Sequence, residues 1–230
     1  MGDELIGYRL EGSVAILDFD DGKANTFSPT SIAALHAALD RAEQEARSIL
    51  WMGRPGRFSA GFDLSFMKQG GRPMIDLVAS GATLALRVYQ SPLPVTLGVT
   101  GHALAMGAIM LLAADSRVGV AGNFKIGLNE VAIGMVLPEF GLEFARARLS
   151  PRHVTRSVSN AEIYTPEGAV EAGYLDRVVS EDSLAEAAVA EATQLAALDP
   201  GAHKATKIAL RRETIARLQA SIDAFPGGPA

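Results

Sequence analysis

A 24-residue stretch without formal charge, from Ser91 to Ala114, constrains the fold more than any other part of the sequence. It reads SPLPVTLGVTGHALAMGAIMLLAA and is long enough to span a bilayer. Two prolines, three glycines and a histidine interrupt it, so its continuous apolar run extends only from Ala103 to Ala114. The pattern therefore predicts a buried strand over 94–101, a glycine turn and a buried helix over 103–114, and no membrane span.

Apolar patterns on either side of this stretch predict alternating strands and helices. Residues 14–20 (VAILDFD) alternate as a strand, residues 48–53 (SILWMG) form an apolar strand, and Ser28 or Thr30 caps a helix between them. Because strand, helix and strand in succession favour a right-handed crossover, we expect a sheet covered by helices. Further strands are expected over 115–122, 124–128 and 174–179, and further helices over 165–173, 183–198 and 202–225.

The chain becomes helical and more charged after Pro151, with no repeat and no low-complexity linker. A length of 230 residues suits one domain with a small appendage. The sequence therefore predicts an α/β core over residues 1–180 and a module of C-terminal helices over residues 181–230. We expect the last residues, PGGPA (226–230), to form a frayed tail.

Composition argues against several classes of function. The net charge is −5 without a basic stripe, which argues against a nucleic-acid partner. The absence of cysteine excludes disulfides, thiolate metal sites and Cys nucleophiles. The four histidines lack the spacing of metal ligands. No G-x-S-x-G elbow is present, which argues against a serine hydrolase. The N-terminal sequence lacks the basic and apolar regions of a signal peptide, so we expect a cytoplasmic protein. A mean hydropathy of +0.17 favours an oligomer.

Four stretches, in order along the chain, are similar to motifs of the crotonase family, the enoyl-CoA hydratase/isomerase superfamily. They are GRFSAGFDLSFM (56–67), SPLPVTLGVTGHALAMGAIMLLAADSRVGV (91–120), FKIGLNEVAIGMVLP (124–138) and TPEGAVEAGYLDRVV (165–179). The resemblance implies an α/β spiral of repeated ββα units with C-terminal helices, assembled as a homotrimer or a dimer of trimers. It also implies an acyl-CoA thioester substrate, with coenzyme A as part of that substrate and no separate cofactor.

The resemblance places two backbone donors of an oxyanion hole at the N–H groups of Phe62 and Met106. Such donors stabilise the negative charge that develops on a thioester oxygen. Relatives usually carry a Gly-Gly-Gly run where this chain has Ala105, Met106 and Gly107, so a Met side chain must fit beside the thioester. Taken without the resemblance, a loop turn at Gly61 and a core position for Met106 explain the same residues.

The acids distinguish the reactions of the family. Its hydratases activate water with two glutamates, and this chain has Ile109 at the first of those positions and Glu130 at the second. A single glutamate suits a proton shuttle, as in the family's monofunctional Δ3,Δ2-enoyl-CoA isomerases, and IGLNE is similar to their local sequence. Apolar neighbours should raise the pKa of Glu130. The alternatives are a hydratase whose second acid is Glu139 or Glu143, a non-catalytic acyl-CoA binder, and a Glu130 that faces solvent or caps a helix.

The resemblance also implies that coenzyme A lies along residues 22–25 and the SAGFDL backbone. The substrate-binding candidates are Lys23, Ala24, Ala60, Asp63, Leu64, Ser65 and Leu128. The apolar run over 74–89 is expected to line the acyl end of the pocket. Lys204, Lys207 and Arg211 share one helix face, which either meets phosphates or is exposed to solvent. Asp115 and Arg117 are expected to form a structural pair, and no metal site is expected.

Overall fold

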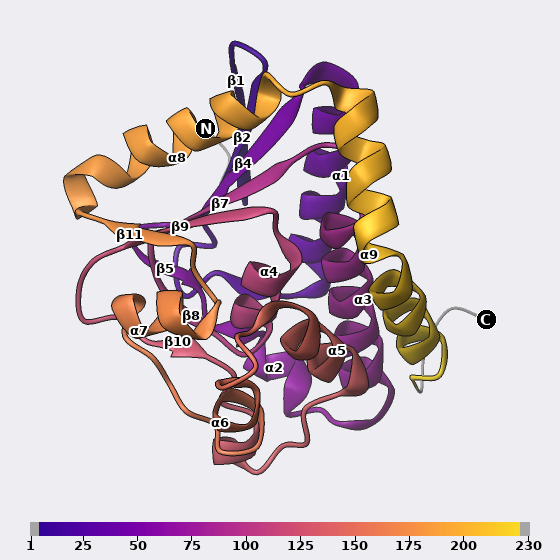
Figure 1. Cartoon of the computed structure of the whole chain (residues 1–230). Coiled ribbons are helices and arrows are strands. Elements are labelled where there is room, and N and C mark those ends of the chain that lie inside the picture. The colour runs from indigo at the N-terminus through magenta and orange to yellow at the C-terminus, as the bar shows by residue number, and fades with distance from the viewer. Residues whose placement is uncertain (1–4, 226–230) are drawn as a thin grey trace.

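A six-stranded sheet lies at the centre of the computed structural model, which describes residues 5–225 (Figure 1). In order across the sheet its strands are β1 (Ile6–Glu11), β2 (Val14–Phe19), β4 (Ser48–Met52), β7 (Val95–Val99), β9 (Ser116–Val120) and β11 (Arg177–Val179). β1 runs antiparallel to β2, and every other neighbouring pair is parallel. The parallel pairing of β2 with β4 confirms the crossover that the sequence predicts.

Shorter strands form two smaller sheets. β5 (Gly56–Ser59), β8 (Gly101–Leu104) and β10 (Ile126–Gly127) pair in the order β10-β8-β5, and β3 (Thr26–Phe27) pairs with β6 (Gly61–Phe62). The chain repeatedly places one strand in the large sheet, the next in a small sheet, and then forms a helix. This alternation is the repeated ββα unit that the resemblance implies, and the fold class is confirmed.

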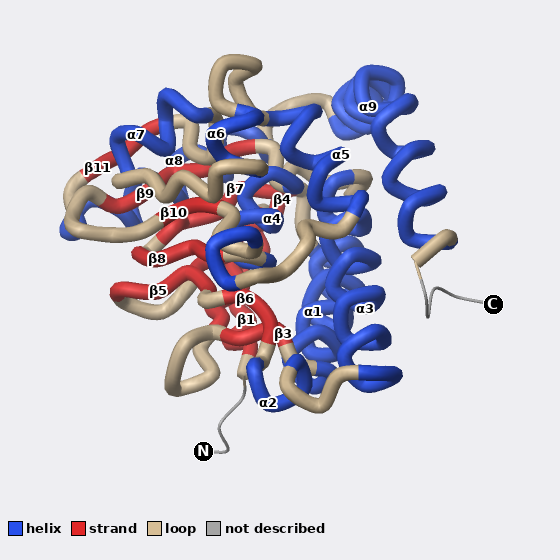
Figure 2. The backbone as a smooth tube through the Cα atoms, turned by 90° about the horizontal axis from the view of Figure 1, so that it is seen from below, coloured by secondary structure: helices blue, strands red, loops and turns tan. Residues whose placement is uncertain are grey.

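Helices cover both faces of the large sheet (Figures 1 and 2). They are α1 (Pro29–Glu45), α2 (Leu64–Met67), α3 (Gly71–Tyr89), α4 (Met106–Ala113), α5 (Glu139–Arg148), α6 (Val154–Val158), α7 (Pro166–Ala172), α8 (Glu181–Ala196) and α9 (Pro200–Asp223), with a 3-10 turn η1 (Val131–Ile133). Ser28, one of the two predicted caps, begins α1 with a capping box, and Thr165 caps α7.

The alternation of β2 explains how the two faces are filled. Ala15 and Leu17 point into the larger core with α1, α3, α4 and α5, while Val14 and Ile16 belong to a second cluster beneath α8. Helix α8 contributes Leu184, Ala188, Ala192 and Ala196, which recur every four residues and so share one side of the helix. The C-terminal helices therefore pack on the chain's own core, whereas the division into domains at residue 180 stays a prediction.

Two expectations about the elements need correction. The predicted helix over 103–114 begins only at Met106, because residues 101–104 pair as strand β8 between β5 and β10. Strand β1 was not predicted, since its half-exposed position at the sheet edge leaves no regular apolar pattern. None of the described helices combines the length and the apolarity needed to cross a membrane. The predicted frayed tail over 226–230 lies outside the described residues.

The predicted pair of Asp115 with Arg117 is wrong. Asp115 instead binds Lys207 at 2.6 Å and Arg211 at 2.8 Å, and Arg117 binds Asp176. Lys207 and Arg211 are buried and also donate to the carbonyls of Leu93 and Tyr89, so they satisfy backbone acceptors at the C-terminal end of α3 and just after it. The expected solvent exposure of this helix face therefore fails for Lys207 and Arg211, while Lys204 is exposed, and phosphate contact stays a prediction.

Candidate functional site

The three segments that carry Phe62, Met106 and Glu130 lie against one another. Strand β8 pairs with β5 on one side and β10 on the other, and the Ala105 N–H donates to the Gly127 carbonyl at 3.1 Å. A Cβ atom placed on Gly61 would lie 3.0 Å from the Ala105 Cβ and 3.5 Å from the Met106 nitrogen. The backbone before Phe62 therefore touches the backbone that begins α4, although the two are far apart in the sequence.

The amide of Met106 has the position of an anion-binding group. Met106 is the first residue of α4, so its N–H has no acceptor within the helix, and no side chain caps this end. The aligned peptide dipoles of a helix also concentrate partial positive charge at such an end. The Met106 side chain is fully buried and Phe62 is half-buried. This arrangement can stabilise a negative oxygen placed between the two amides.

Ala105 has a backbone conformation that L-residues rarely adopt, with φ 51° and ψ −123°. It directly precedes the Met106 amide, and the chain turns there from β8 into α4. Non-glycine residues held in such regions cost about 1–3 kcal/mol each, and the surrounding structure must impose them. The backbone strain at Ala105 therefore lies where relatives usually carry glycine.

Replacing Ala105 with Gly is expected to raise the free energy of unfolding by about 1 kcal/mol. Release of the strain outweighs the roughly 0.4–1 kcal/mol that glycine adds to the conformational entropy of the unfolded chain. Urea denaturation measures the change. The control is Ala185→Gly at an exposed interior position of α8, which should destabilise by about 1 kcal/mol. Equal losses in both variants would show that Ala105 carries no strain.

Glu130 is a buried acid. Its residue exposure is 8%, and its Oε2 atom has no hydrogen-bond partner among residues 5–225. Burial raises the pKa of the Glu130 carboxyl above its ordinary value, and its own backbone N–H only partly opposes this. Glu130 precedes η1 but makes no side-chain cap bond. The solvent-facing and helix-capping interpretations of this residue are therefore wrong.

No second acid is free beside Glu130 at the positions considered from the sequence. Ile109 is an apolar residue of α4 with 2% exposure. Glu143 is buried on α5 and bound by Arg146 at 2.7 Å and Arg217 at 2.6 Å. Desolvation raises the pKa of Glu143, but these hydrogen bonds outweigh it and hold the pKa below its ordinary value. Glu139 is exposed and also binds Arg146. Glu143 is thus held as an ionised partner of two arginines.

A backbone hydrogen bond connects the loop before β3 with the loop before β6, as expected if both loops contact the same coenzyme A. The Ala60 N–H donates to the Ala24 carbonyl at 3.0 Å. The Asp21 carboxylate accepts the backbone N–H groups of Lys23, Asn25 and Thr26, which fixes the loop. The Lys23 side chain remains exposed on this fixed backbone. Lys23, Ala24 and Ala60 therefore lie on one part of the surface.

The remaining substrate-binding candidates fall into different environments. Asp63 caps the short helix α2 by accepting the Ser65 N–H at 2.7 Å, which gives its carboxylate a structural role. Leu64 is 63% exposed and Ser65 is exposed, so both are open to a ligand. Leu128 is only 1% exposed and belongs to the core. The structure thus groups Asp63, Leu64 and Ser65 beside Phe62 and separates Leu128 from that surface.

Gly81 of α3 is a site residue that sequence reasoning missed. A Cβ on Gly81 would lie 2.4 Å from the Phe62 ring and 3.5 Å from the terminal methyl of Met106. The glycine therefore lets α3 approach both side chains that flank the two amides. The small residues of the 74–89 run were the available signal, and the expectation that this run lines the acyl end stays a prediction.

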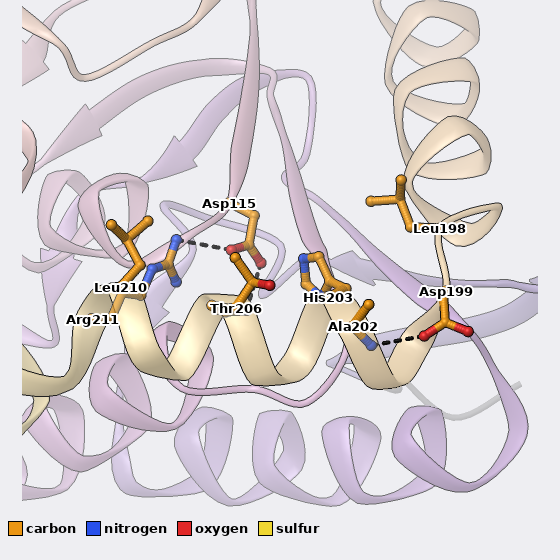
Figure 3. A pocket seen from close by; sticks show the side chains of 9 residues that line it. Asp115, Leu198, Asp199, Ala202, His203, Thr206, Leu210 and Arg211 are labelled. Carbon is orange, nitrogen blue, oxygen red and sulfur yellow. Dashed lines mark hydrogen bonds and ion pairs between the residues drawn. The ribbon is translucent and has the colours of Figure 1, made fainter.

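Two surface hollows of the structure lie elsewhere. One hollow of about 400 Å³ is beside α9, and its polar wall includes Asp115 and Arg211, which bind each other (Figure 3). Another, of about 520 Å³, lies between α1 and α3. Neither hollow is lined by Phe62, Met106 or Glu130, so the hollows and the candidate catalytic residues lie in different parts of the molecule. We place the candidate site by its chemistry, because the charged groups of Asp115, Lys207 and Arg211 beside α9 already pair with one another. Residues 5–225 contain no group of three or more His, Asp or Glu side chains suited to a metal ion.

Comparison with known proteins gives consistent results. A family model described as enoyl-CoA hydratase/isomerase matches residues 9–225. The human protein named mitochondrial enoyl-CoA delta isomerase 1 is 30% identical over 219 residues, which cover 92% of this chain and 72% of the human one. Carnitinyl-CoA dehydratase of Salmonella typhimurium is 32% identical over 199 residues, with 85% and 76% covered. The crystal structure of an enoyl-CoA hydratase/isomerase family protein from Pseudomonas syringae is 46% identical, with a TM-score of 0.94 and 96% of each chain covered.

Proposed function

Because this chain belongs to the enoyl-CoA hydratase/isomerase family, we propose that it converts a 3-enoyl-CoA into the 2-trans-enoyl-CoA. The observation that carries this proposal is a buried acid, Glu130, that no arginine or lysine of residues 5–225 pairs with, unlike the buried Glu143. Glu130 follows β10, which pairs with the strand β8 that leads to the Met106 amide. An isoleucine occupies the position where a second acid would activate water. One carboxyl group can remove and return a proton, whereas water addition needs a second group to orient the water.

The proposed reaction moves one proton. Ionised Glu130 takes a proton from C2 of the 3-enoyl thioester, and the electron pair of that C–H bond spreads over the double bond and the thioester oxygen. The N–H groups of Phe62 and Met106 stabilise the resulting dienolate oxygen. The protonated carboxyl of Glu130 then returns the proton to C4, and the double bond moves to C2–C3. Atoms and charges balance without water, oxidant or cofactor.

The surroundings of Glu130 suit a base of this kind. A raised pKa makes the carboxylate a stronger base, provided that it is still ionised at the working pH. The apolar residues of α4 and Gly81 of α3 keep the amides in a region of low polarity, where their interaction with a negative oxygen is stronger than in water.

The remaining parts of the substrate are assigned by position. We propose that the loop with Lys23 and Ala24, together with Ala60, Leu64 and Ser65, holds the coenzyme A part, with Lys23 near a phosphate. The Asp63 carboxylate contributes by fixing α2, as its cap bond supports. Leu128 acts from the core by packing beneath the loop of Glu130. Exposed Leu198, in the linker between α8 and α9, and exposed Leu210 on α9 support burial in a homotrimer or a dimer of trimers.

Hydration or dehydration is the second candidate reaction, because a carnitinyl-CoA dehydratase is among the relatives. It would require another acid near Glu130. The arginine pairs of Glu143 and the exposure of Glu139 argue against either residue in that role.

Incubation with two acyl-CoA esters tests the proposal. With 3-hexenoyl-CoA we expect 2-trans-hexenoyl-CoA, followed by the absorbance of the conjugated thioester and by chromatography. With crotonyl-CoA we expect no 3-hydroxybutyryl-CoA. Hydration of crotonyl-CoA at a rate equal to or above isomerisation would favour the second candidate, and binding of both esters without turnover would identify a non-catalytic relative.

A further inference from the structure

An exposed apolar turn follows Glu130 directly. Residues 131–136 read VAIGMV, and every one of them is exposed. The large apolar side chains among them are Val131, Ile133, Met135 and Val136, the last of them 88% exposed. None of these four belongs to either apolar core of residues 5–225, or to the half-buried side chains that pack on a core. Single exposed apolar residues are ordinary, but a contiguous run of them marks a surface that binds an apolar group.

The backbone of this apolar turn is fixed to Glu130. The Glu130 carbonyl accepts the N–H groups of Ile133 at 3.1 Å and Met135 at 2.9 Å. The Val131 carbonyl accepts the Gly134 N–H at 3.1 Å, and Gly134 has a left-handed conformation with φ 78°, which closes the turn. The apolar side chains and the acid are therefore carried by one hydrogen-bonded unit of backbone.

The space between the middle of α3 and the two amides is already filled. A Cβ on Gly81 would lie 2.4 Å from the Phe62 ring and 3.5 Å from the terminal methyl of Met106, so no further group fits there. The Phe62 ring also packs edge-on against Phe27, with the ring centroids 6.5 Å apart. A ligand bound at the two amides therefore cannot extend between them and Gly81.

We propose that the apolar turn, residues 131–136, is the surface on which the acyl chain of the substrate lies from C5 onward, and that the enzyme therefore prefers medium and long acyl chains to short ones. This inference rests on the proposed role of Glu130. A carboxyl that takes a proton from C2 and returns it at C4 must lie against both carbons. The rest of the chain then starts beside Glu130 and leaves past the residues that adjoin it.

Burial of apolar surface gives the size of the expected preference. Complete removal of one methylene group from water strengthens binding by about fourfold. The apolar turn covers one side of an extended chain and leaves the other side to solvent, so about half of that free energy is expected. The dissociation constant should then fall by about twofold for each methylene that the acyl chain gains.

Calorimetry with saturated acyl-CoA esters tests the inference in the full chain. Butyryl-, hexanoyl-, octanoyl- and decanoyl-CoA carry no double bond to move, so binding is measured without turnover. For the wild type we expect the Kd to fall by roughly 60-fold from butyryl-CoA to decanoyl-CoA. For the double variant Ile133→Ser, Val136→Ser we expect a fall of less than about fivefold, because serine offers little apolar surface, with the Kd of butyryl-CoA nearly unchanged.

Leu10→Ser is the matched control. Leu10 is an exposed apolar residue of the edge strand β1, so its loss should leave the dependence on chain length intact. Ile75→Ser tests the alternative path along the start of α3, where Ile75 is half-buried. The inference is overturned by an unchanged dependence in the double variant, by equal weakening for butyryl- and decanoyl-CoA, or by a loss confined to Ile75→Ser. If the double variant does not fold, Val136→Ser alone should lose part of the dependence.

Light scattering separates an acyl contact from a contact between two copies of the chain. A double variant that has a lower molar mass and keeps the dependence on chain length would show that a second copy covers the apolar turn, which contradicts the inference. The binding series and the isomerase assay also fail separately. A dependence that the double variant abolishes, in a protein without isomerase activity, would support the acyl contact and reject the proposed function. Isomerase activity without any dependence on chain length would do the reverse.

Discussion

Replacing Glu130 with Gln is expected to lower kcat for isomerisation by about 10²–10⁴-fold, the usual contribution of a general base. Gln keeps the size of the side chain but cannot take a proton from C2 or return it at C4. The two backbone amides remain, so binding of the CoA ester should change little. Stopped-flow or steady-state absorbance of the conjugated product measures kcat, and calorimetry measures binding.

The matched control for this change is Glu139→Gln. Glu139 is an exposed acid at the start of α5 that binds Arg146, so its loss should leave kcat near the wild-type value. Glu130→Gln should not destabilise the fold, because the substitution removes a buried carboxyl whose Oε2 has no partner in the described chain. Retention of most of the turnover in a folded Glu130→Gln protein would remove Glu130 from the mechanism.

Most of the architecture was predictable because its elements have strong local signals. Ser28 and Thr165 cap their helices, and the apolar strand over 48–53 has no other low-energy environment than the interior. The strand β8 was not predicted. An uninterrupted apolar run fits a buried strand and a buried helix equally well, and only the pairing of 101–104 with β5 and β10 decides between them.

The candidate site shows a similar limit. The motifs gave the positions of Phe62, Met106 and Glu130, and the family resemblance, rather than the local sequence, favoured a Glu130 that does not face solvent. The partners of Asp115 lie on α9, more than 90 residues away, so no local pattern could reveal them. Gly81 was missed for the same reason, because it acquires its meaning from Phe62 and Met106, which are distant in the sequence.

Replacing Gly107 with Ala is expected to lower kcat/KM by about 10²–10³-fold, the typical effect of losing one oxyanion donor. An added Cβ would lie 2.6 Å from the Ser59 carbonyl oxygen and 2.9 Å from the Ser59 Cβ, so the backbone must move. Ser59 also accepts the Gly61 N–H through its hydroxyl at 3.1 Å. The added Cβ thus pushes the start of α4 away from the segment before Phe62, and the two amides can no longer share one oxygen.

Overpacking at Gly107 should also destabilise the protein by about 1–3 kcal/mol. Kinetics are therefore measured at a temperature where circular dichroism shows a folded chain. Gly168→Ala is the control, since its Cβ would have ordinary contacts at 3.5 Å in α7, and both activity and stability should be retained. If folded Gly107→Ala kept the wild-type kcat/KM, the two amides could not be the groups that stabilise the dienolate. Glu130 would then have to act with an oxyanion hole formed elsewhere.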